Sequence, residues 1–205
     1  MRWRLASLAS AAALLAAAGC GSSGGSSTHS ASTTAGGTGG AAGLLTAETQ
    51  SAATGDIPDN QVFITYSNPQ PRYSIVAPEG WARKGSGRDV SFTDKNNRVH
   101  VVIAPGAGQV SAASVASELT RLRAAEPALA FTPPARIRLS AGEAVKSTYT
   151  TRSAPNPVTG KQVVLIVDRY ELSKGGKRAT VDLGTAKGVD NIDAYKKMIN
   201  SFRWQ

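Results

Sequence analysis

Four carboxylates could supply acid–base chemistry in this sequence: Glu143, Asp168, Glu171 and Asp182. Two carboxylates that share a cleft can hydrolyse a glycosidic bond, so a hydrolase that works through such a pair is one interpretation. The spacing alone does not pair any two of them. Asp168 and Asp182 are followed or flanked by Arg and Lys on neighbouring segments, and we expect both to form ion pairs across adjoining strands.

Nucleophilic catalysis needs an activated side chain and a base, which is most often histidine. The sequence has two histidines, and only His100 lies beyond residue 57. His100 alternates with Val99 and Val101 on an expected strand, so it points to the opposite face from these valines and we expect a structural or surface role. Beyond residue 57 the chain has no Gly-x-Ser-x-Gly elbow, and the segment 114–117 lacks the lysine of a Ser-x-x-Lys pair. We therefore expect no enzymatic activity.

Two short motifs have the beginnings of a ligand site. Pro105–Gly108 follows a strand and opens a helix, but Ser111 stands where a dinucleotide loop has its third glycine. Asp94 and Asn96 begin like a calcium loop, which then lacks its remaining acidic ligands and its glycine. One cysteine and two histidines exclude a Cys/His zinc site. We expect neither a cofactor nor a metal.

The single cysteine, Cys20, lies where lipid attachment would place it. Arg2 and Arg4 precede an apolar run, Leu5–Ala18, and small residues fill positions 16–19 just before the cysteine. Small side chains before a cleavage site suit a signal peptidase. The run resembles a bacterial lipobox, which implies that the Cys20 thiol receives a diacylglyceryl group and that its new amino terminus is acylated. We expect residues 1–19 to be a lipoprotein signal peptide, and the protein to be anchored on the extracytoplasmic face of the cell membrane.

Composition separates a linker from a folded domain. The segment 21–43 contains only Gly, Ser, Thr and Ala apart from His29, so it cannot bury enough apolar surface to offset the entropy of ordering. We expect the lipidated cysteine and a flexible, disordered linker over residues 20–57, and one globular domain over residues 58–205. A linker of about 35 residues has a root-mean-square reach of roughly 30 Å.

The chain is basic, with a formal net charge of +9 that falls to +7 when Arg2 and Arg4 are removed with the leader. Because the leader directs the domain out of the cytoplasm, nucleic acid is not an expected partner. Basic side chains near a membrane are attracted to anionic head groups. Four arginines are candidates for contacts with such an anionic surface: Arg121, Arg123, Arg136 and Arg138.

The folded part reads as short strands joined by turns, with two helices. Ser111 is expected to cap a helix that runs to about Ala125 and packs through Val115, Leu119 and Leu122. A last helix from about Asp190 places Ile192, Tyr195, Met198, Ile199 and Phe202 on one stripe.

The run Val163–Val167 is apolar on both faces and predicts a central strand that is covered from both sides. Hairpin turns are expected at Asp94–Asn97, Ser140–Gly142 and Lys174–Lys177. This pattern predicts the α+β class, with an antiparallel sheet flanked by helices.

Several of these segments together suggest a family. The opening Tyr73-Ser74-Ile75, the turn Pro78-x-Gly80-Trp81, the hairpin from Asp168 to Arg178 and the ending Ser201–Trp204 resemble PsbP-like domains. The resemblance covers about residues 62–204 and implies an α-β-α sandwich with a non-catalytic binding or assembly role. With its lipobox and its Ala/Gly-rich linker, the chain is most similar to actinobacterial, LpqN-type lipoproteins.

We therefore expect a membrane-anchored module that binds or assembles another component of the cell envelope, such as an envelope protein. The alternative is a lipoprotein that binds a lipid or small molecule between sheet and helix, where Trp81, Tyr149, Tyr170 and Trp204 could line a pocket.

Overall fold

The computed structural model describes residues 55–106, 108–127 and 129–205. The expected signal peptide, Cys20 and the linker as far as residue 54 lie outside the described residues.

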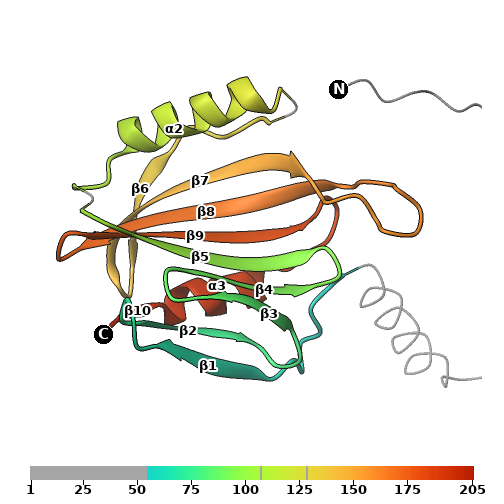
Figure 1. The fold of residues 1–205 in the computed structure, drawn as a ribbon, viewed down its shortest axis with the longest axis horizontal. Helices are drawn as coiled ribbons and strands as arrows, with labels where there is room; N and C mark the ends of the chain where they lie inside the picture. The colour runs from blue at the N-terminus through green and yellow to red at the C-terminus, as the bar shows by residue number, and fades with distance from the viewer. Residues whose placement is uncertain (1–54, 107, 128) are drawn as a thin grey trace, which may run out of the picture. The chain divides into compact units, whose positions relative to one another are not determined.

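Two antiparallel sheets and two helices make up the described part (Figure 1). The larger sheet has seven strands, and β9 (Lys177–Ala186) is its central one. On one side of β9, from the nearest strand outward, lie β5 (Asn97–Pro105), β4 (Asp89–Asp94) and β3 (Ala82–Ser86). On the other side, again from the nearest strand outward, lie β8 (Val164–Lys174), β7 (Gly142–Arg152) and β6 (Ala135–Leu139). The smaller sheet has the order β1 (Phe63–Asn68), β2 (Tyr73–Pro78) and β10 (Arg203–Trp204).

The helices cover opposite faces of the large sheet, which confirms the α+β class (Figure 1). On one face, α2 (Ala112–Ala125) packs Val115 and Leu119 against Val167 and the neighbouring strands. On the other face, α3 (Ile192–Ser201) shares a larger core with the small sheet. The small sheet is an element that the sequence did not predict as separate. It forms because Tyr73 of β2 stacks on Phe202 with ring centroids 5.7 Å apart, which places β10 beside β2.

The three expected hairpin turns are present. β4 and β5 are joined by Lys95 and Asn96, and the positive φ of this turn falls on Lys95, at 51°. Gly175 and Gly176 adopt φ values of 56° and 70°, as a tight two-residue turn between β8 and β9 requires.

The expected helix cap at Ser111 is also present. The Ser111 side chain accepts a hydrogen bond from the Ser114 backbone N–H at 3.1 Å, and the Ser114 hydroxyl accepts one from the Ser111 N–H at 3.1 Å. The expected apolar stripe of this helix is wrong at one position. Leu122 is 42% exposed because α2 packs on the sheet only through Val115 and Leu119.

An ion pair between α2 and the large sheet adds to the narrow apolar contact that Val115 and Leu119 make. The Arg178 guanidinium donates two hydrogen bonds of 2.6 Å to the Glu118 carboxylate on α2 and one of 2.8 Å to Glu171. The hydrogen bond from Arg178 holds the pKa of Glu118 below its ordinary value. Burial raises the pKa of Glu171, although its bond to Arg178 works in the opposite direction. The Arg178 side chain of β9 therefore connects Glu118 of α2 to Glu171 of β8.

The last helix confirms most of its expected stripe. Tyr195, Met198, Ile199 and Phe202 are buried, but Ile192 is 59% exposed. The prediction is wrong at Ile192 because the first turn of α3 borders an open cavity of about 430 Å³.

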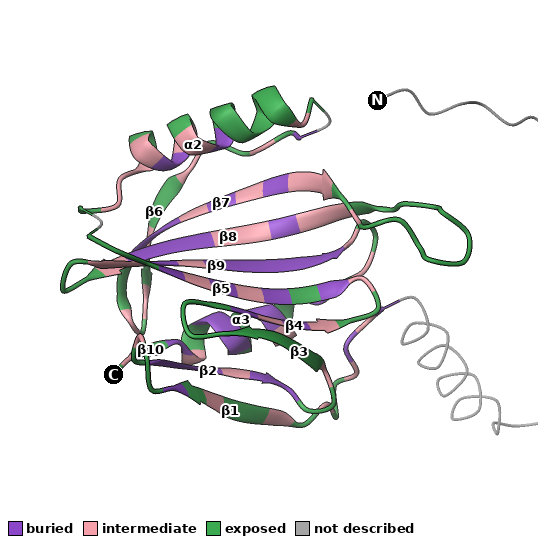
Figure 2. Cartoon of the chain, in the orientation of Figure 1, coloured by how far each residue is buried: buried purple, intermediate pink, exposed green. Residues whose placement is uncertain are grey.

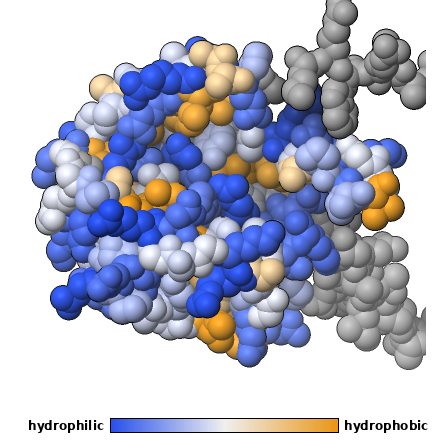
Figure 3. Space-filling view, in the orientation of Figure 1, coloured by the Kyte–Doolittle hydropathy of each residue, from blue (hydrophilic) through white to orange (hydrophobic). Residues whose placement is uncertain are grey.

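The apolar run of β8 departs furthest from expectation. Val163 and Val164 are 39% and 46% exposed, and β9 rather than β8 is the central strand. Figure 2 shows the start of β8 only partly buried. Leu165 and Val167 line a cavity of about 650 Å³ on the α2 face, whereas Ile166 lines the 430 Å³ cavity on the α3 face. The prediction of cover on both faces is wrong because α2 reaches this end only beside β7, where Glu126 accepts hydrogen bonds from Thr151 and Arg152, and the start of β8 has a cavity on each face. Figure 3 shows apolar surface on the β7–β8 loop at the right of the view.

The described chain begins with residues that composition assigned to the linker. The Gly55 carbonyl accepts hydrogen bonds from the side-chain amides of Asn97, at 2.5 Å, and Asn191, at 3.2 Å. The Asn191 side-chain oxygen, Oδ1, accepts from the Ile57 N–H at 2.8 Å, and the Asn191 side-chain amide also donates to the Thr185 hydroxyl at 3.1 Å. The start of the domain is therefore bonded to β5 and to the N-terminus of α3, and Asn191 connects it in turn to β9.

We expect Asn191→Ala to lower the free energy of unfolding by about 2–3 kcal/mol, because it leaves the buried Ile57 N–H without an acceptor and removes one of the two donors to Gly55. Urea unfolding of the chain measures this change. Asn200→Ala is the matched control, because Asn200 is exposed on the same helix. Equal stabilities of the two variants would contradict the importance of the Asn191 amide.

Candidate functional site

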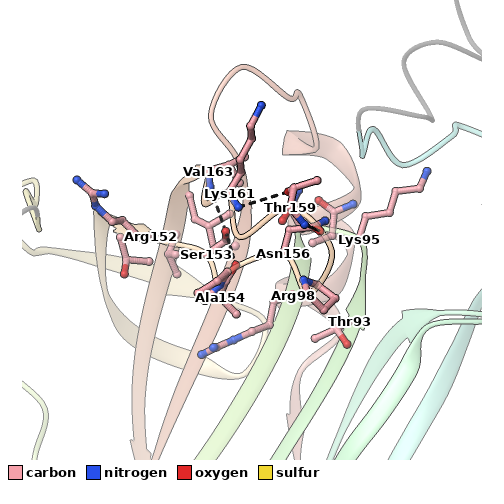
Figure 4. A pocket seen from close by; sticks show the side chains of 18 of the residues that line it. Thr93, Lys95, Arg98, Arg152, Ser153, Ala154, Asn156, Thr159, Lys161 and Val163 are labelled. Carbon is pink, nitrogen blue, oxygen red and sulfur yellow. Dashed lines mark hydrogen bonds between the residues drawn. The ribbon is translucent and has the colours of Figure 1, made fainter. Parts of the chain in front are cut away.

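A groove on the α2 face of the large sheet is the candidate site, and we call it the basic groove. It has a volume of about 650 Å³ and lies between the β4–β5 hairpin and the β7–β8 loop (Figure 4). Its lining comprises Thr93, Lys95, Asn96, Asn97, Arg98, Tyr149, Thr151, Arg152, Ser153, Ala154, Pro155, Asn156, Pro157, Thr159, Lys161, Val163, Leu165, Val167 and Gly184.

The floor of the basic groove is apolar. Tyr149 and Gly184 both lie opposite Val167 in the strand register, and Leu165 continues the same face of β8. A Cβ atom at Gly184 would lie 3.3 Å from the Val167 side chain, which is a tight contact. The glycine therefore lets Val167 pack closely over β9 and keeps the floor low at this point.

The rim of the basic groove carries four cations and no carboxylate. Lys95 and Arg98 come from the β4–β5 hairpin, and Arg152 and Lys161 come from the two ends of the β7–β8 loop (Figure 4). Arg98, Arg152 and Lys161 form no salt bridge within the described ranges of the chain. The Arg98 guanidinium donates instead to His100 Nδ1 at 2.8 Å. The lining residues therefore carry a net positive charge above an apolar floor, and the nearby Glu126 carboxylate accepts hydrogen bonds from the lining Thr151 hydroxyl at 2.8 and 3.0 Å.

The loop that forms one wall is held by its own hydrogen bonds. The Asn156 side-chain oxygen accepts from the backbone N–H groups of Val158, at 2.9 Å, and Thr159, at 3.0 Å, and the Asn156 carbonyl accepts from the Gly160 N–H at 2.8 Å. At the base of the loop, Val163 N–H donates to the Ser153 hydroxyl at 3.1 Å, a bond drawn in Figure 4. These bonds form the wall of the groove before any ligand arrives.

A buried ion pair supports the floor. Arg169 donates two hydrogen bonds, of 2.8 and 2.7 Å, to Asp182, which is 3% exposed. The Tyr149 hydroxyl donates to the same carboxylate at 3.1 Å, and the Arg169 guanidinium lies 5.1 Å from the Tyr149 ring centroid. Burial raises the pKa of Tyr149, and the Asp182 charge raises it further. Burial alone would lower the pKa of Arg169, but its hydrogen bonds to Asp182 outweigh this and raise it. Tyr149 and Arg169 therefore both stay protonated near neutral pH.

The carboxylates singled out in the sequence are all engaged by basic or hydroxyl side chains. Asp168 pairs with Lys146 at 2.8 Å, so the expectation of ion pairs for Asp168 and Asp182 is confirmed. The two aspartates lie on opposite faces of the sheet, because Asp168 lines the cavity beside α3 and Asp182 packs under the α2 face. Glu171 is bonded to Arg178, and Glu143 is 3.9 Å from Arg136.

His100 also has two partners. Its Nδ1 accepts the bond from Arg98, so the ring N–H is at Nε2, which lies 2.7 Å from Asp89 Oδ1. Val99 and Val101 are fully buried on the other side of β5, as the alternation predicted. No serine, threonine or cysteine hydroxyl or thiol bonds to this imidazole among the hydrogen bonds of the described segments.

The four arginines expected at an anionic surface lie on two elements. Arg121 and Arg123 belong to α2 and Arg136 and Arg138 to β6, and all four side chains are exposed. Arg123 lies over the Phe131 ring at 5.3 Å. Their contact with an anionic surface stays a prediction.

Within the described ranges, the acidic, histidine and cysteine side chains form no cluster that could hold a metal ion. In the same part of the chain, no helix combines the length and the hydropathy that crossing a membrane requires.

Comparison with solved structures identifies the fold. The solution structure of cyanobacterial PsbP from Synechocystis superimposes with a TM-score of 0.50 at 16% identity, over 75% of this chain and 99% of that one. The fold is PsbP-like. A crystal structure from Bacteroides thetaiotaomicron gives a TM-score of 0.44 at 10% identity over 69% of this chain and 48% of that one. Mycobacterium tuberculosis LpqN, described as involved in cell envelope biogenesis, gives 0.40 at 13% identity over 71% of this chain and 91% of that one.

No protein-family model matches the sequence. No curated protein sequence matches it either.

One feature of the sequence, an interval without acidic residues, pointed to the basic groove of this PsbP-like domain, although it forms no recognised motif. Between Glu143 and Asp168 there is no acidic residue, while Lys146, Arg152 and Lys161 fall in this interval. Lys95 and Arg98 carried no comparable signal, because only the folded sheet brings the β4–β5 hairpin beside this segment.

We expect Arg169→Met to lower the free energy of unfolding by about 3–5 kcal/mol, because it leaves the Asp182 charge buried without its partner. Adding Asp182→Asn should recover a large part of the loss, since the amide is neutral and still accepts from Tyr149. Urea unfolding of both variants tests this, with Arg138→Met as the exposed control. A small effect of Arg169→Met, or no recovery in the double variant, would contradict the assigned role.

Proposed function

We propose that this chain is a lipid-anchored, extracytoplasmic binding module without catalytic activity, and that its basic groove binds an amphipathic anion. The observation that carries the proposal is the composition of the groove: four cationic side chains and no carboxylate line it, and its floor is apolar. Of the functions expected from the sequence, this arrangement favours the binding of a lipid or small molecule.

The charges set the polar part of the ligand. A phosphate or carboxylate accepts charge-assisted hydrogen bonds from arginine and lysine, each worth about 1.5–3 kcal/mol where the site is shielded from water. Arg152 and Lys161 come from the two ends of the β7–β8 loop and Arg98 comes from the β4–β5 hairpin, so an anionic group in the groove has cations on both walls (Figure 4).

The floor sets the apolar part of the ligand. Leu165, Val167 and the Tyr149 ring offer a continuous apolar strip, and covering such surface contributes about 25 cal/mol per Å². An alkyl chain or a ring attached to the anion would lie along this strip. A small inorganic anion would leave the strip in contact with water and would bind more weakly.

The side chains argue against a hydrolase that works through carboxylates. Asp168 and Asp182 are separated by the sheet, and each is held by a cation. A general acid in such a pair needs a carboxyl group that can be protonated beside the scissile bond. The basic groove contains no carboxyl group among its lining residues.

The anchor rests on the sequence around Cys20, where small residues precede the only cysteine of the chain. Two or three acyl chains at this position would hold the domain stably at the membrane, whereas one chain is marginal.

Dodecyl phosphate is the probe for the groove, and calorimetric titration below its micelle concentration measures its dissociation constant. We expect Arg152→Glu combined with Lys161→Glu to raise this constant at least about ten-fold, because two attractive charges become repulsive. Lys174→Glu is the matched control, since Lys174 lies in the turn at the other end of β8. Uncharged dodecanol should bind more weakly than the phosphate. Unchanged affinity in the double variant would exclude the basic groove as the site.

The anchor predicts that Cys20→Ser abolishes the incorporation of labelled palmitate in cells and moves the protein from the membrane fraction to the soluble fraction after a high-salt wash. No other thiol can replace Cys20, because the chain has one cysteine. Label that persists in the Cys20→Ser protein would rule out lipidation at this residue.

A further inference from the structure

The chain enters the domain beside the basic groove. Gly55 is bonded to Asn97, which lines the groove, and to Asn191, which lines the cavity on the other face of the sheet. In Figure 1 this entry point lies at the same end of the large sheet as the β4–β5 turn and the β7–β8 loop. We call this the entry end: residues 55–57, the turn at 95–96, the loop 153–163 and the connection 187–191.

Apolar side chains are exposed at the entry end. Val158, at the tip of the β7–β8 loop, is 90% exposed, and Val163 and Val164 at its base are 39% and 46% exposed. Ile192, just after the connection to α3, is 59% exposed. Figure 3 shows the apolar surface on the β7–β8 loop at the right of the view, with hydrophilic surface around it. The tip of this loop protrudes, so it suits a deformable surface better than a preformed protein pocket.

Charge at the entry end favours an anionic partner. Arg152, the last residue of β7, and Lys161 in the loop lie on either side of Val158 in the sequence, and Lys187 is exposed on the connection after β9. The loop itself has no acidic residue; the acidic residues nearby are Asp56 on the entering segment, Asp94 before the β4–β5 turn and Asp190 on the connection, where Asp190 accepts a hydrogen bond from the Ile192 N–H at 3.1 Å. An apolar tip between two cations matches an interface in which lipid phosphates lie above acyl chains.

We propose that the entry end docks on an anionic lipid bilayer, with Val158 inserted at the level of the head groups and Arg152 and Lys161 on lipid phosphates. The inference rests on the proposed function, because lipid at Cys20 would bring this end of the domain to the membrane. Only the residues from Cys20 to Thr54 separate the anchor from Gly55. The docked domain opens its basic groove toward the bilayer, so the groove takes an anionic amphiphile directly from the membrane.

The test uses the processed chain, residues 20–205, with Cys20→Ser, so that no acyl chain contributes to binding. Sedimentation with vesicles of equimolar phosphatidylglycerol and phosphatidylcholine measures the partition coefficient, and vesicles of phosphatidylcholine alone give the uncharged reference. We expect binding to the anionic vesicles, weakened by 1 M NaCl, and a coefficient about five- to ten-fold lower for Val158→Asp.

Leu122→Asp is the matched control, because Leu122 is an exposed apolar residue on α2 and is not one of the residues that make up the entry end. The proposal is overturned if the anionic vesicles bind no more protein than the uncharged ones, if Val158→Asp binds like the parent, or if Leu122→Asp loses as much as Val158→Asp. Val158 does not line the basic groove, so Val158→Asp should still bind dodecyl phosphate. Docking that persists while dodecyl phosphate fails to bind would instead refute the groove as a ligand site.

A second measurement reports the depth of insertion. With Cys20 replaced, Val158→Cys provides a single thiol for an environment-sensitive nitrobenzoxadiazole label. Its emission should rise and shift to the blue on anionic vesicles, whereas the same label at Leu122→Cys should not change. Equal responses at the two positions would contradict an orientation that places the β7–β8 loop in the interface.

Discussion

The seven-stranded sheet is longer than the elements that cover it, and the candidate site depends on this mismatch. β7 and β8 have eleven residues each and span about 36 Å at 3.3 Å per residue. α2 has fourteen residues and α3 has ten, so they are about 21 and 15 Å long. Neither helix can cover a whole strand. The uncovered end of β8 has Leu165 and Val167 open to one cavity and Ile166 open to the other, which is why apolar floors exist on both faces.

Buried charged side chains determine which residues of this sheet can be substituted without a large loss of stability. Asp182 and Arg169 lie beneath the groove, and Arg178 joins Glu171 to α2. Taking charges out of water is costly unless each one keeps its partner, so these positions constrain the floor and the placement of the helix. The cations on the rim are exposed, and replacing them costs little stability. Substitutions in the floor of the basic groove are therefore limited by the stability of the fold, whereas the cations on the rim can change to suit a ligand.

Local signals allowed much of the fold to be predicted. The Ser111 cap, the glycine turn between β8 and β9, and the buried stripe from Tyr195 to Phe202 each depend on neighbours in the sequence. The run at Val163 was misread, because an apolar run has the same pattern whether a helix or a cavity lies over it. The prediction that Ile192 is buried was wrong for the same reason. The groove could be foreseen only in part: the interval without acids after Glu143 is visible in the sequence, but the approach of Lys95 and Arg98 depends on the order of strands in the sheet.

The bonds at Gly55 also bear on how the domain withstands mechanical tension. A pull from the N-terminal side reaches Gly55 first, where the amides of Asn97 and Asn191 share the load between β5 and α3. β1 lies later in the chain and is shielded from direct peeling while these bonds hold. Resistance to forced unfolding is a matter of rate, and sharing a load among several bonds slows their rupture. A domain fixed to a moving surface would in this way keep its fold under drag.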